Sequence, residues 1–186
     1  RIQSTDHISY AVVLNKTPFY AEAGGQVSDT GKIIGDGFEL EVRAMYTYQD
    51  FYIHEGFLIH GEAEAIKAGS AVTAEVDAER RWDIMRNHTV THLTHTALRK
   101  VLGSHIKQSG SYVGPEHMRF DFPHHQPMTL AEIRAVEEII NNEIIKGTNV
   151  NTEVMDIEAA RKTGAIALFG EKYDETVRVV SGGGCS

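Results

Sequence analysis

The chain has 186 residues, of which 41% are hydrophobic, so it is long enough for one large or two small domains with a buried core. No apolar run approaches the roughly 20 residues of a membrane-spanning helix, and the N-terminal residues lack a signal-peptide pattern, so we expect no membrane partner. The formal charge of −8 argues against a protein that coats nucleic acid nonspecifically.

The first part of the chain has the pattern of short β-strands. Alternating apolar stretches cover residues 8–14, 38–45, 51–59 and 71–76, and glycine-containing turns separate them. Several short strands at this spacing are typical of a small barrel or folded sheet. The pattern predicts a glycine-rich, β-barrel-like subdomain over residues 1–77.

Helices are predicted after residue 77. Asn87 is the expected N-cap of a helix over residues 88–102, which Gly103 would end. Thr129 and Glu132 form a capping-box pattern that predicts a second helix up to Gly147, and a short third helix is expected between Asp156 and Gly164.

Strands are expected at residues 118–122, 148–154 and 176–180, with a weaker candidate at 165–169. In the first of these, Met118, Phe120 and Phe122 share one face. The mixture predicts an α+β fold, with an antiparallel sheet and packed helices over residues 78–186.

The sequence NHTVTHLTH over residues 87–95 concentrates histidines in the first predicted helix. At 3.6 residues per turn, His88, His92 and His95 lie on one face with Thr91 beside them. Two histidines four residues apart can direct ring nitrogens to one zinc ion, but zinc needs at least three protein ligands. From the spacing alone, a solvated polar face is the stronger interpretation. Further candidate ligands without a clear geometric argument are His95, His105, His117, His124 and His125.

Two other features admit both a functional and a structural interpretation. Gln108 follows the histidine helix and is either an amide that orients a ligand or an ordinary turn residue. A basic stretch is either a local contact for nucleic acid or a solvated helix surface; it comprises Arg80, Arg81, Arg86, Arg99, Lys100 and Lys107.

Four blocks in order along the chain resemble the editing domain of alanyl-tRNA synthetase. They are a glycine-rich block with TPFYAEAGGQ at residues 17–26 and DTG at 29–31, the histidine block RNHTVTHL at 86–93, MRFDF at 118–122, and GAIALFGEKY at 164–173. The resemblance implies a β-barrel-like subdomain followed by an α+β subdomain that is related to free-standing alanyl-tRNA editing proteins and to the threonyl-tRNA synthetase editing region.

The same resemblance implies roles for individual residues. His88 and His92 match the family's first two zinc ligands, and Thr91 and Gln108 match its active-site threonine and glutamine. The implied activity is hydrolysis of tRNA(Ala) mischarged with serine or glycine, and we expect its acceptor end to approach between the two subdomains, near Arg86 and Lys107. ATP would bind only to a synthetic domain outside this chain.

The C-terminal residues depart from the family pattern. The family's remaining zinc ligands lie in a Cys-Gly-Gly-Thr-His segment, whereas Cys185 falls a few residues before the matching cysteine. We therefore expect the chain to stop short of that motif and its zinc site to be incomplete. Because Cys185 is the only cysteine, no disulfide framework is possible, and a reducing cytoplasmic location is expected.

Three interpretations of function remain open at this stage. The chain is an editing segment of a synthetase, a free-standing protein that edits in trans, or a tRNA-binding module without catalysis in this truncated form.

Overall fold

The computed structural model describes residues 9–162 and 175–181, which form two compact units. Unit 1 extends to Asn87 and also includes Tyr112–His117, whereas unit 2 consists of His88–Ser111 and the described residues from Met118 onward. The α+β class is confirmed. Within the described residues, no helix is long and apolar enough to cross a membrane.

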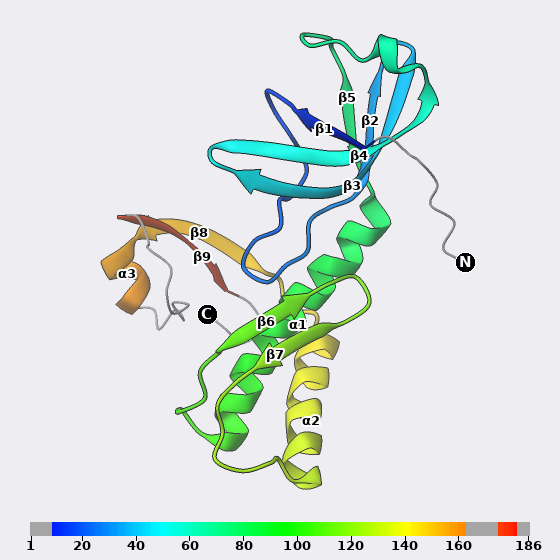
Figure 1. The fold of residues 1–186 in the computed structure, drawn as a ribbon. Helices are drawn as coiled ribbons and strands as arrows, with labels where there is room; N and C mark the ends of the chain where they lie inside the picture. Colours follow the sequence, from blue (N-terminus) through cyan, green and yellow to red (C-terminus); the bar gives the residue numbers. More distant parts are fainter. Residues whose placement is uncertain (1–8, 163–174, 182–186) are drawn as a thin grey trace, which may run out of the picture. The chain divides into compact units, whose positions relative to one another are not determined.

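Unit 1 is built on a five-stranded antiparallel sheet with the order β1-β4-β3-β2-β5 (Figure 1). The strands are β1 (Ser9–Val13), β2 (Gly31–Gly35), β3 (Phe38–Tyr48), β4 (Phe51–Gly61) and β5 (Thr73–Val76), and the short 3₁₀-helix η1 (Ala63–Ala65) precedes β5. Among the described residues the edge strands β1 and β5 do not pair with each other. The sheet is therefore open, and the predicted barrel is not confirmed.

The core of unit 1 follows from the alternation of side chains along β3. Phe38, Leu40 and Val42 are buried in turn, and a β-bulge after Val42 shifts the phase so that Met45 continues the buried row. Ile33 from β2 and two residues of the preceding loop complete this cluster. The strand pattern of the sequence thus buries one face of the sheet.

The glycine-rich block forms the loop between β1 and β2, and two buried polar side chains anchor it. Asp29 is 1% exposed and accepts hydrogen bonds from Arg81 and from the Tyr20 backbone N–H at 2.6 Å. His54 is also 1% exposed, and its ring nitrogens lie 3.0 Å from the Val12 carbonyl and 2.8 Å from the Thr17 hydroxyl. The block therefore has a structural role in holding the loop against the sheet and the helix that follows.

Helix α1 (Ala78–Leu102) begins ten residues earlier than Asn87 would allow as its N-cap. Asp77 caps the helix instead, because its carboxylate accepts the Arg80 backbone N–H at 3.0 Å. Asn87 lies inside the helix, and its side-chain amide donates to the carbonyls of Gly114 and Pro115 at 2.8 and 3.1 Å. The predicted start at Asn87 is wrong, whereas the predicted end before Gly103 is confirmed.

The segment Tyr112–His117 belongs to unit 1 through backbone contacts with the glycine-rich block. The Val113 N–H donates to the Gly25 carbonyl at 2.8 Å, and the Val113 carbonyl accepts from the Val27 N–H at 3.0 Å. Together with the Asn87 amide, these bonds fix a segment that is distant in sequence from the rest of unit 1.

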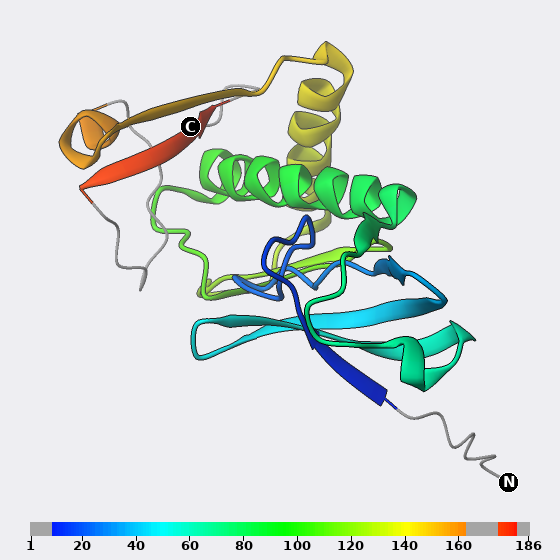
Figure 2. The same ribbon diagram turned by 90° about the horizontal axis from the view of Figure 1, so that it is seen from above.

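Unit 2 has its own core between the C-terminal half of α1 and helix α2 (Leu130–Lys146), which lie side by side in both views (Figures 1 and 2). Its buried residues are Ala97, Leu98, Ile106 and Val136. The Thr129–Glu132 capping box is present, and Gly147 ends α2 in the left-handed conformation, so both predicted ends of this helix are confirmed.

The remaining strands form two separate pairs, although the pattern had predicted one antiparallel sheet. β6 (Gly110–Val113) pairs with β7 (Met118–Asp121), and β8 (Asn151–Asp156) pairs with β9 (Thr176–Ser181). Helix α3 (Ile157–Lys162) follows β8. The predicted strand at 165–169 and the helix end at Gly164 lie outside the described residues.

Candidate functional site

His88 and His92 lie one turn apart on the exposed side of α1, as the sequence predicts. Their imidazole rings stack with centroids 5.2 Å apart and planes only 18° from parallel. Both side chains reach solvent, while Leu93 and Ala97 on another face of the helix are buried. The helix thus presents two aligned imidazoles outward and keeps its apolar residues in the core.

The surrounding protein disfavours the charged form of both imidazoles. The pKa of His88 is lowered by desolvation first and by the charge of His92 second, and desolvation alone lowers the pKa of His92. A neutral imidazole carries a free lone pair, which is the form that accepts a proton or ligates a metal.

Thr91 and His95 are buried on the same helix. Thr91 is 7% exposed and lies on the helix beside His88 and His92. His95 is 6% exposed, its ring centroid lies 5.2 Å from that of Phe120 in a tilted arrangement, and its Nε2 is buried without a hydrogen-bond partner. Burial lowers the pKa of His95 despite a hydrogen bond with the Ile106 backbone. His95 is therefore packed in the core of unit 2, although helical periodicity puts it on the face of His88 and His92, and it interacts electrostatically with His92.

Gln108 lies on the connection between α1 and β6 and is half-buried. Its side-chain Nε2 donates to the Ser111 hydroxyl at 3.1 Å. The amide is thus oriented by a residue of the neighbouring strand β6. The structure brings His88 and His92 together, and it places Gln108 on a different element of unit 2.

Several members of the predicted basic stretch have protein partners. Arg81 is paired with Asp29, Arg80 donates to the Ser28 carbonyl at 2.8 Å, and Arg86 is paired with Asp83. Hydrogen bonding to Asp29 is the main cause that raises the pKa of Arg81. Half of the stretch is therefore engaged in local structure, which agrees with the structural interpretation for these three residues.

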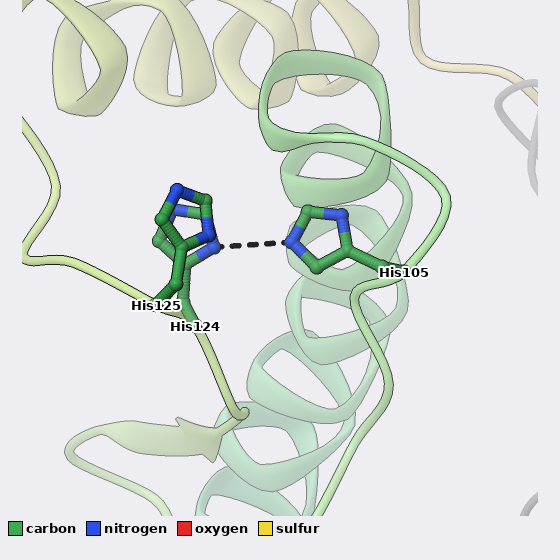
Figure 3. Close-up of side chains that lie close together, drawn as sticks. All are labelled: His105, His124 and His125. Carbon is green, nitrogen blue, oxygen red and sulfur yellow. Dashed lines mark hydrogen bonds between the residues drawn. The ribbon is translucent and has the colours of Figure 1, made fainter.

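The structure also assembles a histidine cluster that the sequence pattern did not predict. His105 follows α1, whereas His124 and His125 lie between β7 and α2, and Figure 3 shows the three rings turned toward one another. The three residues were single candidates in the sequence, because nothing in their spacing places position 105 beside positions 124 and 125. The only available signal was the consecutive pair His124-His125.

Two predicted features fall outside the residues that the structure describes. These are the block at residues 164–173 and the C-terminal residues that include Cys185.

Residues 2–80 match the model of the family described as tRNA synthetases class II (A). The chain is 53% identical over 170 residues to the alanine–tRNA ligase of Paracidovorax citrulli (strain AAC00-1), which covers 91% of this chain and 18% of that protein. It is 50% identical over 173 residues to the alanine–tRNA ligase of Acidovorax sp. (strain JS42), which covers 92% of this chain and 20% of that protein.

These similarities confirm the resemblance to alanyl-tRNA synthetases over nearly the whole chain. The chain spans about one fifth of the length of the curated relatives that it matches.

Proposed function

We propose that this chain is the editing module of an alanine–tRNA ligase and hydrolyses tRNA(Ala) mischarged with serine or glycine. The proposal starts from its similarity to an alanine–tRNA ligase over 91% of its length. The observation that carries the proposal is the aligned pair His88 and His92 on the exposed side of α1, with the buried hydroxyl of Thr91 beside them. A solvent-accessible pair of imidazoles with lowered pKa values is suited to positioning a water or a metal at an ester.

The two histidines fit the first two positions of a zinc site. Their rings are stacked and reach solvent, and their lowered pKa values favour the neutral form. A catalytic zinc needs three protein ligands, so at least one more ligand would lie outside the described residues. When bound, the zinc would orient the aminoacyl group or supply a water of lowered pKa.

The amino acid would be selected by hydrogen bonding to its hydroxyl. Gln108 offers an amide donor that now satisfies the Ser111 hydroxyl at 3.1 Å, and a serine substrate would present the same kind of acceptor. Thr91 would contribute a hydroxyl from the same helix as the histidine pair. A site built to bond a substrate hydroxyl leaves polar groups unpaired when alanine enters, so Ser-tRNA(Ala) is hydrolysed in preference to Ala-tRNA(Ala). This contact does not select glycine, which has no hydroxyl.

The test is deacylation of Ser-tRNA(Ala), Gly-tRNA(Ala) and Ala-tRNA(Ala) by the full-length ligase that contains this segment. Replacing Gln108 with Ala or Thr91 with Val should slow Ser-tRNA(Ala) hydrolysis on the order of 10²-fold, because the aminoacyl group would be misplaced. Thr94→Val on the same helix and Gln126→Ala on an exposed loop are the matched controls and should leave the rate unchanged.

Two results would contradict the proposal. Unchanged hydrolysis in the Gln108 variant would remove that residue from the site. Binding of tRNA(Ala) by the parent enzyme with no hydrolysis of either mischarged form would instead show a tRNA-binding module without catalysis.

A further inference from the structure

The cluster of His105, His124 and His125 lies outside the site described above, although within the same unit. The Nε2 of His105 and the Nδ1 of His124 are hydrogen-bonded at 3.1 Å, and their rings stack at 5.3 Å (Figure 3). The ring of His125 is centred 4.3 Å from that of His124 and 6.2 Å from that of His105. One ligand nitrogen from each residue lies within 4.8 Å of the other two.

These separations are close to those of a metal centre. Two nitrogens that bind one tetrahedral zinc at the usual bond length are about 3.3–3.4 Å apart. The pair His105 and His124 already matches this spacing within a few tenths of an ångström. His125 must move its nitrogen by about 1.5 Å, which a side-chain rotation achieves at an exposed position.

The surroundings also suit a cation. His105 and His125 are exposed and His124 is half-buried, so an ion can enter from solvent. His124 and His125 line an open surface hollow together with Phe122, Gln126, Pro127 and Met128. Glu132 interacts electrostatically with both of them and adds a negative charge to the neighbourhood.

We propose that His105, His124 and His125 form a second metal site, which binds a late first-row divalent cation such as Zn²⁺ through three imidazole nitrogens and completes its coordination with water. Imidazole ligands select such ions over magnesium or calcium, which prefer oxygen. The site is distinct from the pair His88 and His92.

A bound ion would join two connections of unit 2. His105 belongs to the segment after α1, and the other two histidines belong to the segment between β7 and α2. Ile106, Phe122 and Met128 of these segments pack on the core cluster between the two helices. The metal would therefore act as a cross-link at one end of that core and would stabilise the folded form by mass action.

The experiment is a calorimetric titration of the 186-residue chain with ZnCl₂, followed by a titration with Co²⁺ read by visible absorption. The protein carries no polyhistidine tag, and His88→Ala/His92→Ala forms the common background, so that the first pair does not contribute. Three variants are then compared in this background, each with one further substitution: His105→Ala, His125→Ala and the control His60→Ala. His60 is an exposed residue of β4.

The background protein should bind one equivalent of zinc, and its Tm should rise by about 5–10 °C at a hundredfold excess over Kd. Loss of either cluster histidine should weaken binding at least about tenfold, since even outer-sphere partners of metal ligands are worth that much. His60→Ala should leave Kd unchanged. Affinity within about twofold of the background in His105→Ala or His125→Ala would overturn the three-histidine site, as would an equal loss in His60→Ala.

Discussion

The buried carboxylate of Asp29 provides a sharp test of how the glycine-rich block is held in place. In Asp29→Ala, three hydrogen bonds disappear: two from the Arg81 guanidinium and one from the Tyr20 backbone N–H. The Asp29 side chain is 1% exposed, whereas that of Arg81 is 32% exposed. The substitution therefore leaves the part-buried Tyr20 N–H without its acceptor and the partly buried Arg81 cation without its counter-ion.

The size of the loss follows from this burial. Removing one partner of a buried ion pair costs about 3–5 kcal/mol of the free energy of unfolding. Because a third of Arg81 is open to water, the guanidinium can recover some hydration, which favours the lower end of that range. We expect Asp29→Ala to lower the free energy of unfolding by about 3 kcal/mol, which corresponds to a fall in Tm of about 6–12 °C for a chain of this length.

Urea denaturation followed by far-UV circular dichroism measures this difference. Asp83→Ala is the matched control, because Asp83 pairs with Arg86 across one turn of α1 and both side chains are exposed. Such a pair is worth less than about 0.5 kcal/mol. A double variant with Arg81→Met should be less destabilised than the sum of the single variants, since no unpaired cation remains. If Asp29→Ala costs no more than Asp83→Ala, the buried pair does not hold the block.

Other consequences can be measured on the same chain. Burial lowers the pKa of four histidines, namely His54, His88, His92 and His95. The unfolded chain therefore binds more protons than the folded chain near pH 6. The stabilisation is fully present above about pH 6.5, and it is lost as the pH drops through that value. A Tm that does not decrease between pH 7.5 and 5.5 would contradict this. Gly56→Ala would place a Cβ 1.9 Å from the Glu41 carbonyl oxygen and should disrupt the β3–β4 pairing, whereas Gly69→Ala meets no atom within 4 Å and should cost only about 1 kcal/mol in thermal denaturation. Thr129→Ala removes the cap of α2 and should cost about 1 kcal/mol, and an unchanged Tm would show that the cap contributes nothing.

Elements whose signals are local could be predicted from the sequence. Both ends of α2 follow from the Thr129–Glu132 box and from Gly147, because capping chemistry depends only on residues a few positions apart. The face of β7 that packs on the core could also be predicted from local alternation. Phe120 in β7 and Phe122 just after it both pack on the core of unit 2.

Elements that depend on distant partners were missed or misplaced. The first turns of α1 carry few apolar residues, and contacts of Arg80 and Arg81 with the glycine-rich block support them. β2 has only three residues between its glycines, and it exists because β3 and β5 flank it on both sides. Tertiary contacts override local propensity in both cases.

The candidate site shows the same division. The stacking of His88 and His92 follows from helical periodicity, which sequence spacing reports directly. His105 and His124 are 19 positions apart on two irregular segments, and no periodicity relates such positions. Only the fold brings these two nitrogens within hydrogen-bonding distance.

The membership of Tyr112–His117 in unit 1 constrains how the protein is made on the ribosome. All of His88–Ser111, which belongs to unit 2, is synthesised before the last segment of unit 1 emerges. Until then, the Gly25 carbonyl and the Val27 N–H lack their partner Val113, and the Asn87 amide lacks its two acceptors. Folding of unit 1 therefore cannot finish in strict N-to-C order, and no single proteolytic cut separates it intact from every part of unit 2. A nick within His88–Ser111 would leave both halves of the unit held only by noncovalent contacts.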